Sequence, residues 1–258
     1  MNNKIKIPSL TTKNGKIFLY EYLKLHKKKN LKNAENINEI NFLSFCLNNL
    51  EFSYSQTFQD LYVLYKLNSK KSGHFVEFGS CDGIKNSNSY LMEKKYNWDG
   101  IVCEPLHIWH KMLLKNRNCK IDFSCIYSSS NLELDFIVAL NKIDLSTIKK
   151  FIDSDNFKNR REQKNETIKV KTLSLNDLLK KYKTPKFFDY LSIDTEGSEY
   201  EILKTFDFEK YSPKIITVEH NFNKINISQI KKILNKNNYI QDFEIFSEQD
   251  LWFYKNNL

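Results

Sequence analysis

Between residues 74 and 254 the sequence alternates short apolar runs with segments of helical period, and this alternation constrains the fold more than any other feature. The runs have the length and the β-branched and aromatic content of buried strands, and the intervening segments repeat apolar residues every three or four positions. Strands that alternate with helices predict a doubly wound α/β fold with a mostly parallel sheet. The expected strands cover 74–79, 100–103, 119–126, 132–138, 168–172, 187–193 and 214–219, and a closing pair covers 239–245 and 251–254. The expected helices cover 57–67, 87–96, 108–115, 175–182, 199–206 and 228–236.

Residues 1–52 differ from this pattern in both charge and periodicity. Residues 1–32 hold nine lysines and one glutamate, a net charge of +8 out of +9 for the whole chain. Apolar residues at helical spacing between 17 and 50 predict two helices, so we expect an N-terminal basic helical arm or cap, through which two copies could form a homodimer. The main domain then covers 53–258, with a charged, Asn-rich insertion at 139–167 that interrupts the alternation.

The composition excludes several classes of protein. A hydrophobic fraction of 41%, without an apolar run near the roughly 18 residues of a bilayer-spanning helix, predicts a folded chain with no transmembrane segment. The first residues lack the pattern of a secretory signal peptide, so we expect a cytoplasmic protein with reduced cysteines. Nucleic acid is not an expected partner, because arginine reads guanine and clamps phosphates and only Arg117, Arg160 and Arg161 are arginines.

Polar residues stand at the carboxyl ends of the expected strands, where parallel α/β sheets bind their ligands. The first strand ends in Glu77 and Gly79, and Asp82 and Gly83 follow, so this turn holds two of only six glycines in the chain. Glycine allows a sharp turn and a close approach of the backbone to a ligand. The pattern predicts a nucleotide-like ligand, although it does not match the dinucleotide fingerprint Gly-x-Gly-x-x-Gly.

Glu104 ends the second expected strand, 27 residues after Glu77. A carboxylate at this position can accept hydrogen bonds from both ribose hydroxyls of an adenosine. The arrangement suits an unphosphorylated ribose, which disfavours NADP and leaves NAD and S-adenosylmethionine open. An NAD-dependent oxidoreductase is therefore an alternative at this point, and capping of the next helix beside Pro105 is an alternative role for Glu104.

Several motifs follow one another in order between residues 53 and 221. They are Ser55-Gln56 with Gln59-Asp60, Phe75-Val76-Glu77-Phe78-Gly79 with Asp82-Gly83, Ser87-Asn88, Trp98 with Gly100-Ile101, Glu104-Pro105, DYLSIDTEGSE at 189–199, and Glu219-His220-Asn221. Together they resemble the FkbM family of S-adenosylmethionine-dependent methyltransferases. The resemblance implies a Rossmann-like class I methyltransferase fold, with a mostly parallel seven-stranded sheet and an antiparallel C-terminal hairpin, and S-adenosylmethionine as the cofactor.

The resemblance also implies which residues bind the cofactor. Glu77, Gly79 and Asp82 would line its methionine and adenosine part, and Gly83, Asn88 and Asp194 are also expected to bind the cofactor. Glu104 would hold the ribose, and Ser124 and Cys125 would border the adenine.

Asp194 and Glu196 follow one expected strand and Glu219, His220 and Asn221 follow the next, so these side chains should meet at one edge of the sheet. Methyl transfer to a hydroxyl requires the alcohol to lose its proton, and two devices can remove it. One is a base, for which His220, with Asp194 and Glu196, is the candidate. The other is a divalent metal, Mg²⁺ or Mn²⁺, held by Asp194, Glu219 and Asn221 in a way similar to catechol-type O-methyltransferases.

We therefore expect an S-adenosylmethionine-dependent O-methyltransferase. The family resemblance suggests as acceptor a hydroxyl of a sugar, a sugar phosphate or a nucleotide sugar used in the biosynthesis of a surface glycan such as capsule or lipopolysaccharide. A phosphorylated acceptor would suit the basic arm and Arg160 or Arg161. The alternatives are methylation of a non-sugar small molecule and a module that binds the cofactor without catalysis.

Overall fold

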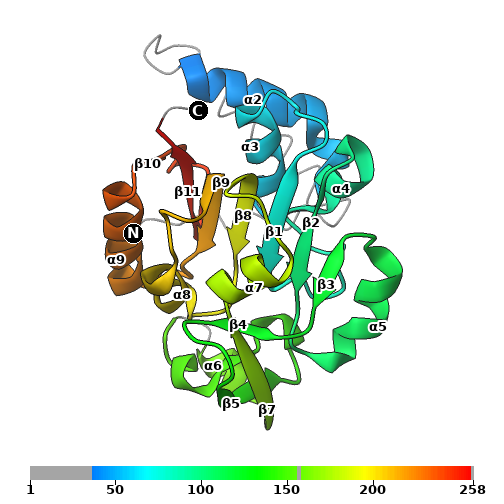
Figure 1. Ribbon diagram of the computed structural model, residues 1–258, viewed down its shortest axis with the longest axis vertical. Helices are drawn as coiled ribbons and strands as arrows, with labels where there is room; N and C mark the ends of the chain where they lie inside the picture. Colours follow the sequence, from blue (N-terminus) through cyan, green and yellow to red (C-terminus); the bar gives the residue numbers. More distant parts are fainter. Residues whose placement is uncertain (1–36, 156–157, 257–258) are drawn as a thin grey trace. The chain divides into compact units, whose positions relative to one another are not determined.

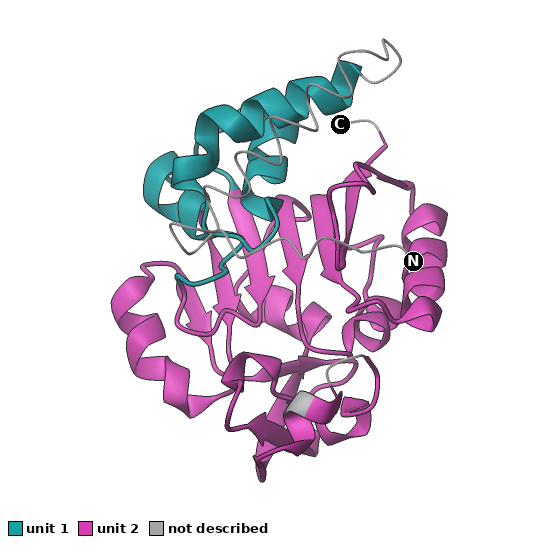
Figure 2. Ribbon diagram, turned by 180° about the vertical axis from the view of Figure 1, so that it is seen from behind, with its two compact units in different colours: residues 1–73, 84–98 teal, residues 74–83, 99–258 magenta. Residues whose placement is uncertain are grey.

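The computed structural model describes residues 37–155 and 158–256, so most of the expected basic arm lies outside the described residues. The described residues group into two compact units, which Figure 2 shows in different colours. The smaller unit comprises residues 37–73 and 84–98, and the larger comprises residues 74–83 and 99–256. The domain boundary expected at residue 53 stays a prediction.

The smaller unit is helical. Its elements are α2 (Ile37–Asn49), the 3-10 helix η2 (Leu50–Phe52), α3 (Gln59–Lys66) and α4 (Tyr90–Tyr96). Phe42 of α2 is buried, and its ring centroid lies 5.4 Å from that of Tyr65 in α3. The Ser55–Asp60 motif supports the start of α3, because the Asp60 N–H donates a hydrogen bond to Ser55 Oγ (2.8 Å) and the buried carboxylate of Asp60 accepts one from the Tyr54 N–H (2.8 Å). This part of the family motif therefore has a structural role.

The larger unit contains, among the described residues, a seven-stranded sheet of order β10-β11-β9-β8-β1-β2-β3 (Figure 1). Its strands are β1 (His74–Phe78), β2 (Asp99–Cys103), β3 (Lys120–Asp122), β8 (Phe187–Ile193), β9 (Ser212–Glu219), β10 (Tyr239–Gln241) and β11 (Asp250–Lys255). Neighbouring strands are parallel in the series β9-β8-β1-β2-β3. β11 runs antiparallel to both β9 and β10. The predicted fold class, a mostly parallel sheet with an antiparallel C-terminal hairpin, is confirmed.

The longer helices of this unit each link two strands that follow one another in the chain. They are α5 (His107–Asn116), α7 (Leu175–Lys181), α8 (Glu199–Thr205) and α9 (Lys224–Lys236). Polar side chains fix where two of them begin, since Ser174 Oγ accepts a hydrogen bond from the Asp177 N–H (3.1 Å) and Asn223 Oδ1 accepts one from the Ile225 N–H (3.0 Å). The core that the sheet and helices share includes Val76, Leu178, Leu191, Ile202, Ile216 and Ile230. None of the helices in the described ranges is long and apolar enough to cross a bilayer.

A second sheet, drawn in the lower part of Figure 1, has four strands among the described residues, in the order β4-β7-β5-β6. They are β4 (Cys125–Tyr127), β5 (Glu133–Ala139), β6 (Thr147–Ile148) and β7 (Asn165–Ser174). The insertion expected at 139–167 supplies β6, the start of β7, α6 (Lys158–Glu162) and the 3-10 helices η3 (Ile143–Leu145) and η4 (Lys149–Phe151). The insertion is therefore part of this small sheet.

The single strand predicted at 119–126 is wrong, because β3 and β4 belong to different sheets. β3 ends at Asp122, whose Oδ1 accepts a hydrogen bond from the Ser124 N–H two residues further on (2.9 Å). This turn interrupts the strand, while the apolar alternation continues across it in the sequence. The strand predicted at 239–245 is also shorter than expected, since Phe243 has a φ of 45° and cannot continue an extended strand.

Candidate active site

The glycine-rich loop, residues 79–83, packs against the residue that follows β8. Gly79 has a φ of +70°, and a Cβ there would collide with the carbonyl oxygen of Asp194. Gly83 has a φ of +82°, and a Cβ there would lie 2.7 Å from Leu113 Cδ1. Both positions require glycine, because an L side chain disfavours a positive φ and has no room. The loop therefore brings its backbone directly against Asp194.

Glu77 in β1 is buried and pairs with Arg117, the residue after α5. Arg117 Nη1 lies 3.5 Å from Glu77 Oε2 and donates a hydrogen bond to the Gly83 carbonyl oxygen (3.3 Å). The Arg117 side chain is fully buried, so this ion pair ties β1 to the end of the glycine-rich loop. The expected contact of Glu77 with the cofactor stays a prediction. Sequence reasoning missed Arg117, which lies 40 residues from its partner and belongs to no motif.

Glu104 follows β2 and connects it to the glycine-rich loop. Its Oε2 accepts a hydrogen bond from the Cys81 N–H and its Oε1 accepts one from the Leu106 N–H, both at 2.9 Å. Burial raises the pKa of Glu104 to about 7. A carboxylate oxygen has two acceptor positions, so these bonds leave room for hydrogen bonds from ribose hydroxyls. The surroundings of Glu104 are compatible with its expected role.

The other residues expected to bind the cofactor lie in separate places. Asp82 is in the glycine-rich loop, and its carbonyl oxygen accepts a hydrogen bond from Asn116 Nδ2 (2.8 Å). Ser124 lies in the turn between β3 and β4, and Cys125 begins β4. Burial, and to a lesser degree the carboxylate of Glu104, raises the pKa of the Cys125 thiol to about 12. Asn88 is buried in the smaller unit, and its role stays a prediction.

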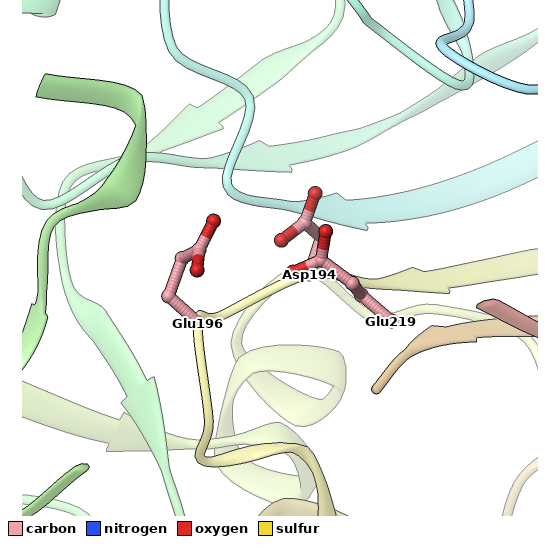
Figure 3. Close-up of side chains that lie close together, drawn as sticks. All are labelled: Asp194, Glu196 and Glu219. Atoms are coloured by element: carbon pink, nitrogen blue, oxygen red, sulfur yellow. The ribbon is translucent and has the colours of Figure 1, made fainter. Parts of the chain in front are cut away.

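Three carboxylates, Asp194, Glu196 and Glu219, meet at the carboxyl ends of β8 and β9, and we call them the carboxylate cluster. One oxygen atom from each lies within 4.8 Å of the others (Figure 3). Burial raises the pKa of Asp194 to about 6, and burial together with the neighbouring charges raises the pKa values of Glu196 and Glu219 well above their usual range. These three, with Asn221, make four of the five residues that were expected to meet here.

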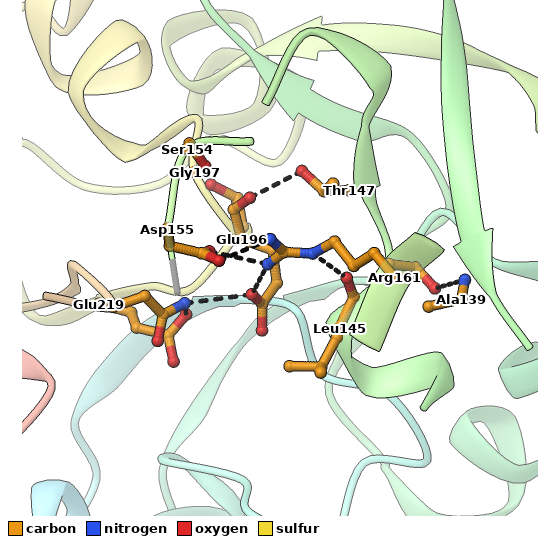
Figure 4. Close-up of polar contacts among 12 residues, drawn as sticks. Ala139, Leu145, Thr147, Ser154, Asp155, Arg161, Glu196, Gly197 and Glu219 are labelled. Carbon is orange, nitrogen blue, oxygen red and sulfur yellow. Dashed lines mark hydrogen bonds and ion pairs between the residues drawn. The ribbon is translucent and has the colours of Figure 1, made fainter. Parts of the chain in front are cut away.

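A buried arginine of the insertion reaches the carboxylate cluster (Figure 4). Arg161 in α6 donates from Nη1 and Nη2 to the two carboxylate oxygens of Asp155 (2.7 and 2.8 Å), and from Nη2 to Glu196 Oε2 (2.5 Å). Its Nε donates to the carbonyl oxygen of Leu145 (2.7 Å), and the side chain is fully buried. The expected contact of Arg161 with a phosphorylated acceptor is therefore wrong, because these partners enclose its guanidinium. The side chain of Arg160 lies outside the described part of the chain.

Two amides complete the surroundings of the carboxylate cluster. Asn221 Nδ2 donates to Glu219 Oε2 (2.7 Å) and Glu196 Oε2 (3.1 Å), and Gln249 Nε2 donates to Glu219 Oε1 (3.1 Å). Asn221 is only 3% exposed, and its Oδ1 accepts no hydrogen bond from any described residue. Such a buried acceptor costs free energy unless a ligand satisfies it. Sequence reasoning missed Gln249, which precedes β11 and lies 30 residues from its partner.

Within the described residues, His220 is not part of the carboxylate cluster. Its Nδ1 accepts a hydrogen bond from the Phe222 N–H (3.0 Å), so the neutral ring carries its proton on Nε2. Burial lowers the pKa of His220 to about 4, and the charged side chains that influence it are Lys231 and Glu244. The ring is therefore neutral near pH 7, and its Nδ1 lone pair is already occupied by the backbone.

The fold and the site together define a class of protein. A parallel sheet with a glycine-rich loop after β1, a carboxylate after β2 and acidic residues after β8 and β9 is typical of α/β enzymes that bind a nucleotide-like cofactor at the carboxyl ends of their strands. The model of the methyltransferase FkbM domain matches residues 77–241, well over half of the chain. The chain belongs to this family, so the resemblance found in the sequence is confirmed.

Solved structures similar to this chain include three methyltransferases. The methyltransferase FkbM from Methylobacillus flagellatus is 14% identical, with a TM-score of 0.49, over 92% of this chain and 58% of that one. The precorrin-6y C5,15-methyltransferase from Geobacter metallireducens is 11% identical, with a TM-score of 0.40, over 79% of this chain and 88% of that one. The plantazolicin methyltransferase BpumL, in complex with S-adenosylhomocysteine (SAH), is 10% identical, with a TM-score of 0.39, over 93% of this chain and 99% of that one. This chain thus spans 58% of the length of the Methylobacillus protein, and no curated protein matches it significantly.

Proposed function

We propose that this chain is an S-adenosylmethionine-dependent methyltransferase and that it transfers the methyl group to a hydroxyl oxygen. The observation that carries the proposal is the carboxylate cluster beside the glycine-rich loop, where the carbonyl oxygen of Asp194 packs against Gly79. An alcohol must lose its proton as it attacks the methyl group, so a group that takes up this proton has to lie next to the cofactor. The cluster supplies carboxylates at this place, which suits an oxygen acceptor.

We also propose that the carboxylate cluster takes part in holding a divalent cation. Asp194, Glu219 and Asn221 offer hard oxygen donors, which suit Mg²⁺ or Mn²⁺. Two observations support this fit. The carboxylates of the cluster outnumber the single positive charge of Arg161, and Asp155 already shares that charge. The buried Oδ1 of Asn221 has no hydrogen-bond donor among the described residues. A bound divalent cation lowers the pKa of a hydroxyl that coordinates it.

His220 is the weaker candidate for the proton acceptor. Its Nδ1 is occupied by the Phe222 N–H, and its low pKa makes the ring a poor base near pH 7. Asp194, in contrast, borders the glycine-rich loop and lies within the carboxylate cluster. We therefore assign proton removal to the cluster, with Asp194 as the residue next to the cofactor loop.

The proposed acceptor is a sugar, a sugar phosphate or a nucleotide sugar used to build a surface glycan. The membership of the FkbM family supports this proposal, whereas the buried ion pair of Arg161 gives no support for a phosphate on the acceptor. Methylation of a non-sugar small molecule and cofactor binding without catalysis remain the alternatives. We also propose that the protein acts in the cytoplasm and that it forms a homodimer through its N-terminal helices.

A methyl-transfer assay tests the proposal. The full chain with S-adenosylmethionine, Mg²⁺ or Mn²⁺ and a panel of the three acceptor classes should yield a product heavier by one methyl group, attached to oxygen. Glu219→Gln should abolish this product and retain binding of SAH, whereas Lys158→Met, on an exposed side chain of α6, should change neither. A methyl group on nitrogen or carbon would contradict the proposal, and SAH binding without transfer to any acceptor would favour the non-catalytic alternative.

A further inference from the structure

Residues of the insertion fix the position of Glu196. Its carbonyl oxygen accepts a hydrogen bond from Thr147 Oγ1 (2.7 Å), and its Oε2 accepts one from Arg161 Nη2 (2.5 Å). Glu196 has a left-handed φ of 57°, and the next residue, Gly197, has a φ of 122° and would place a Cβ 2.5 Å from Ser154 Oγ. The insertion therefore determines both the backbone conformation of Glu196 and the direction of its carboxylate.

Arg161 gives Glu196 a permanent counter-ion. Among the described contacts, Asp194 and Glu219 have no such direct cationic partner. A guanidinium does not lose its proton in proteins, and the bidentate pair with Asp155 holds this one in place. Glu219 instead accepts hydrogen bonds from the neutral amides of Asn221 and Gln249. The three carboxylates are thus unequal, and Glu196 is the one that pairs directly with a guanidinium.

Glu196 in turn orients the amide of Asn221. The amide turns its nitrogen toward the two carboxyl groups, since Nδ2 donates to Glu196 Oε2 (3.1 Å) and to Glu219 Oε2 (2.7 Å). This orientation leaves Oδ1 as the amide atom without a donor among the described residues. A chain of contacts from Arg161 through Glu196 to Asn221 therefore decides which oxygen atoms remain available to a cation.

We propose that Arg161 is a positioning residue that withholds Glu196 from the cation and leaves Asp194, Glu219 and Asn221 as the cation ligands. The inference rests on the cation site of the proposed function. A divalent cation and a guanidinium compete for the same carboxylate, and the guanidinium held by Asp155 is always present. Since affinity for a divalent cation rises with the number of charged ligands, Arg161 weakens the site and permits exchange of the cation.

Calorimetric titration of the full chain with Mn²⁺ in the presence of SAH tests this role. The double variant Arg161→Met with Asp155→Asn removes the guanidinium but keeps the local net charge, and it leaves no unpaired Asp155 carboxylate behind. We expect it to bind Mn²⁺ about tenfold more tightly than the wild type, because Glu196 becomes a third carboxylate ligand. Adding Glu196→Gln should restore the wild-type affinity, and Glu196→Gln alone should change it by less than about threefold, as for a carboxylate that is not a ligand.

Control variants separate this role from general effects of charge or folding. Arg161→Lys keeps the positive charge and should stay close to the wild-type affinity, and Lys158→Met removes an exposed charge from the same helix and should have no effect. The affinity for SAH reports whether each variant is folded. Unchanged Mn²⁺ affinity in the double variant, or loss of Mn²⁺ binding in Glu196→Gln alone, would overturn the inference. Methyl transfer to oxygen by a wild-type chain that does not bind Mn²⁺ would also overturn it, while leaving the proposed reaction intact.

Discussion

Arg117 and Arg161, both buried, stabilise two regions of the site in different ways. Arg117 pairs with one carboxylate, Glu77, beside the glycine-rich loop. Arg161 pairs with Asp155 and Glu196 in a region that also holds two further carboxylates. Positive and negative charge are matched in the first pair, and negative charge is in excess around the second. A matched buried pair supports structure, whereas an excess of buried negative charge points to a functional site that takes a positively charged partner.

Arg117→Met should have the largest effect, on the matched region. The substitution leaves the buried carboxylate of Glu77 without its cation, which costs about 3–5 kcal/mol of unfolding free energy, measured by urea denaturation. Combining it with Glu77→Gln should recover much of this loss, because the unpaired charge disappears. A single variant as stable as the wild type would show that the pair does not support the fold.

Glu219→Gln should have the largest effect on catalysis, in the region of excess charge. Loss of this carboxylate disrupts the group that we assign to proton removal, so kcat should fall at least about 100-fold while the Kd for SAH stays the same. The same chemical change at the exposed Glu133 of β5 is the matched control and should alter neither value. A parallel loss of SAH binding would place Glu219 in the cofactor site instead.

The affinity for SAH should increase with pH because of Glu104. Burial raises its pKa to about 7, so the free protein holds a proton there at lower pH, while ribose hydroxyls donate to the ionised form. The affinity should therefore fall by up to about tenfold for each pH unit below 7 and level off above it. Glu104→Gln should give a weaker affinity that does not change between pH 6 and 8, and the same slope in this variant would contradict the assignment.

Thr147→Val should have the smallest effect, on the region of excess charge. The variant removes the hydrogen bond to the buried carbonyl oxygen of Glu196, which costs about 1 kcal/mol of unfolding free energy. Thr147→Ser keeps the hydroxyl group and serves as the control in the same urea titration. If valine and serine variants are equally stable, the hydrogen bond does not hold Glu196 in place.

The sequence located those site residues that directly follow a strand. Glu104, Asp194 and Glu219 each stand at the end of an apolar run, and the parallel order of the sheet brings such ends to one edge. The glycine-rich loop was predicted for the same reason, because it directly follows β1. The fold class followed from the alternation of strands and helices, since each run buries its apolar side chains in one shared core.

The partners of these residues could not be predicted. Arg117 and Arg161 lie 40 and 35 residues from Glu77 and Glu196, and only tertiary packing brings them together. The charged sequence around Arg161 resembles an exposed insertion, although the side chain is buried. The turn at Asp122 was missed because a side-chain hydrogen bond interrupts a strand whose apolar alternation continues.

Binding of Mn²⁺ tests most directly the central claim that the excess negative charge forms a cation site. The full chain is titrated with Mn²⁺ in the presence of SAH, and free Mn²⁺ is followed by electron paramagnetic resonance. We predict a single saturable site per chain that disappears in Asp194→Asn and in Glu219→Gln and is retained in Glu133→Gln. A lack of saturable binding, or a site that survives both substitutions in the carboxylate cluster, would contradict the account.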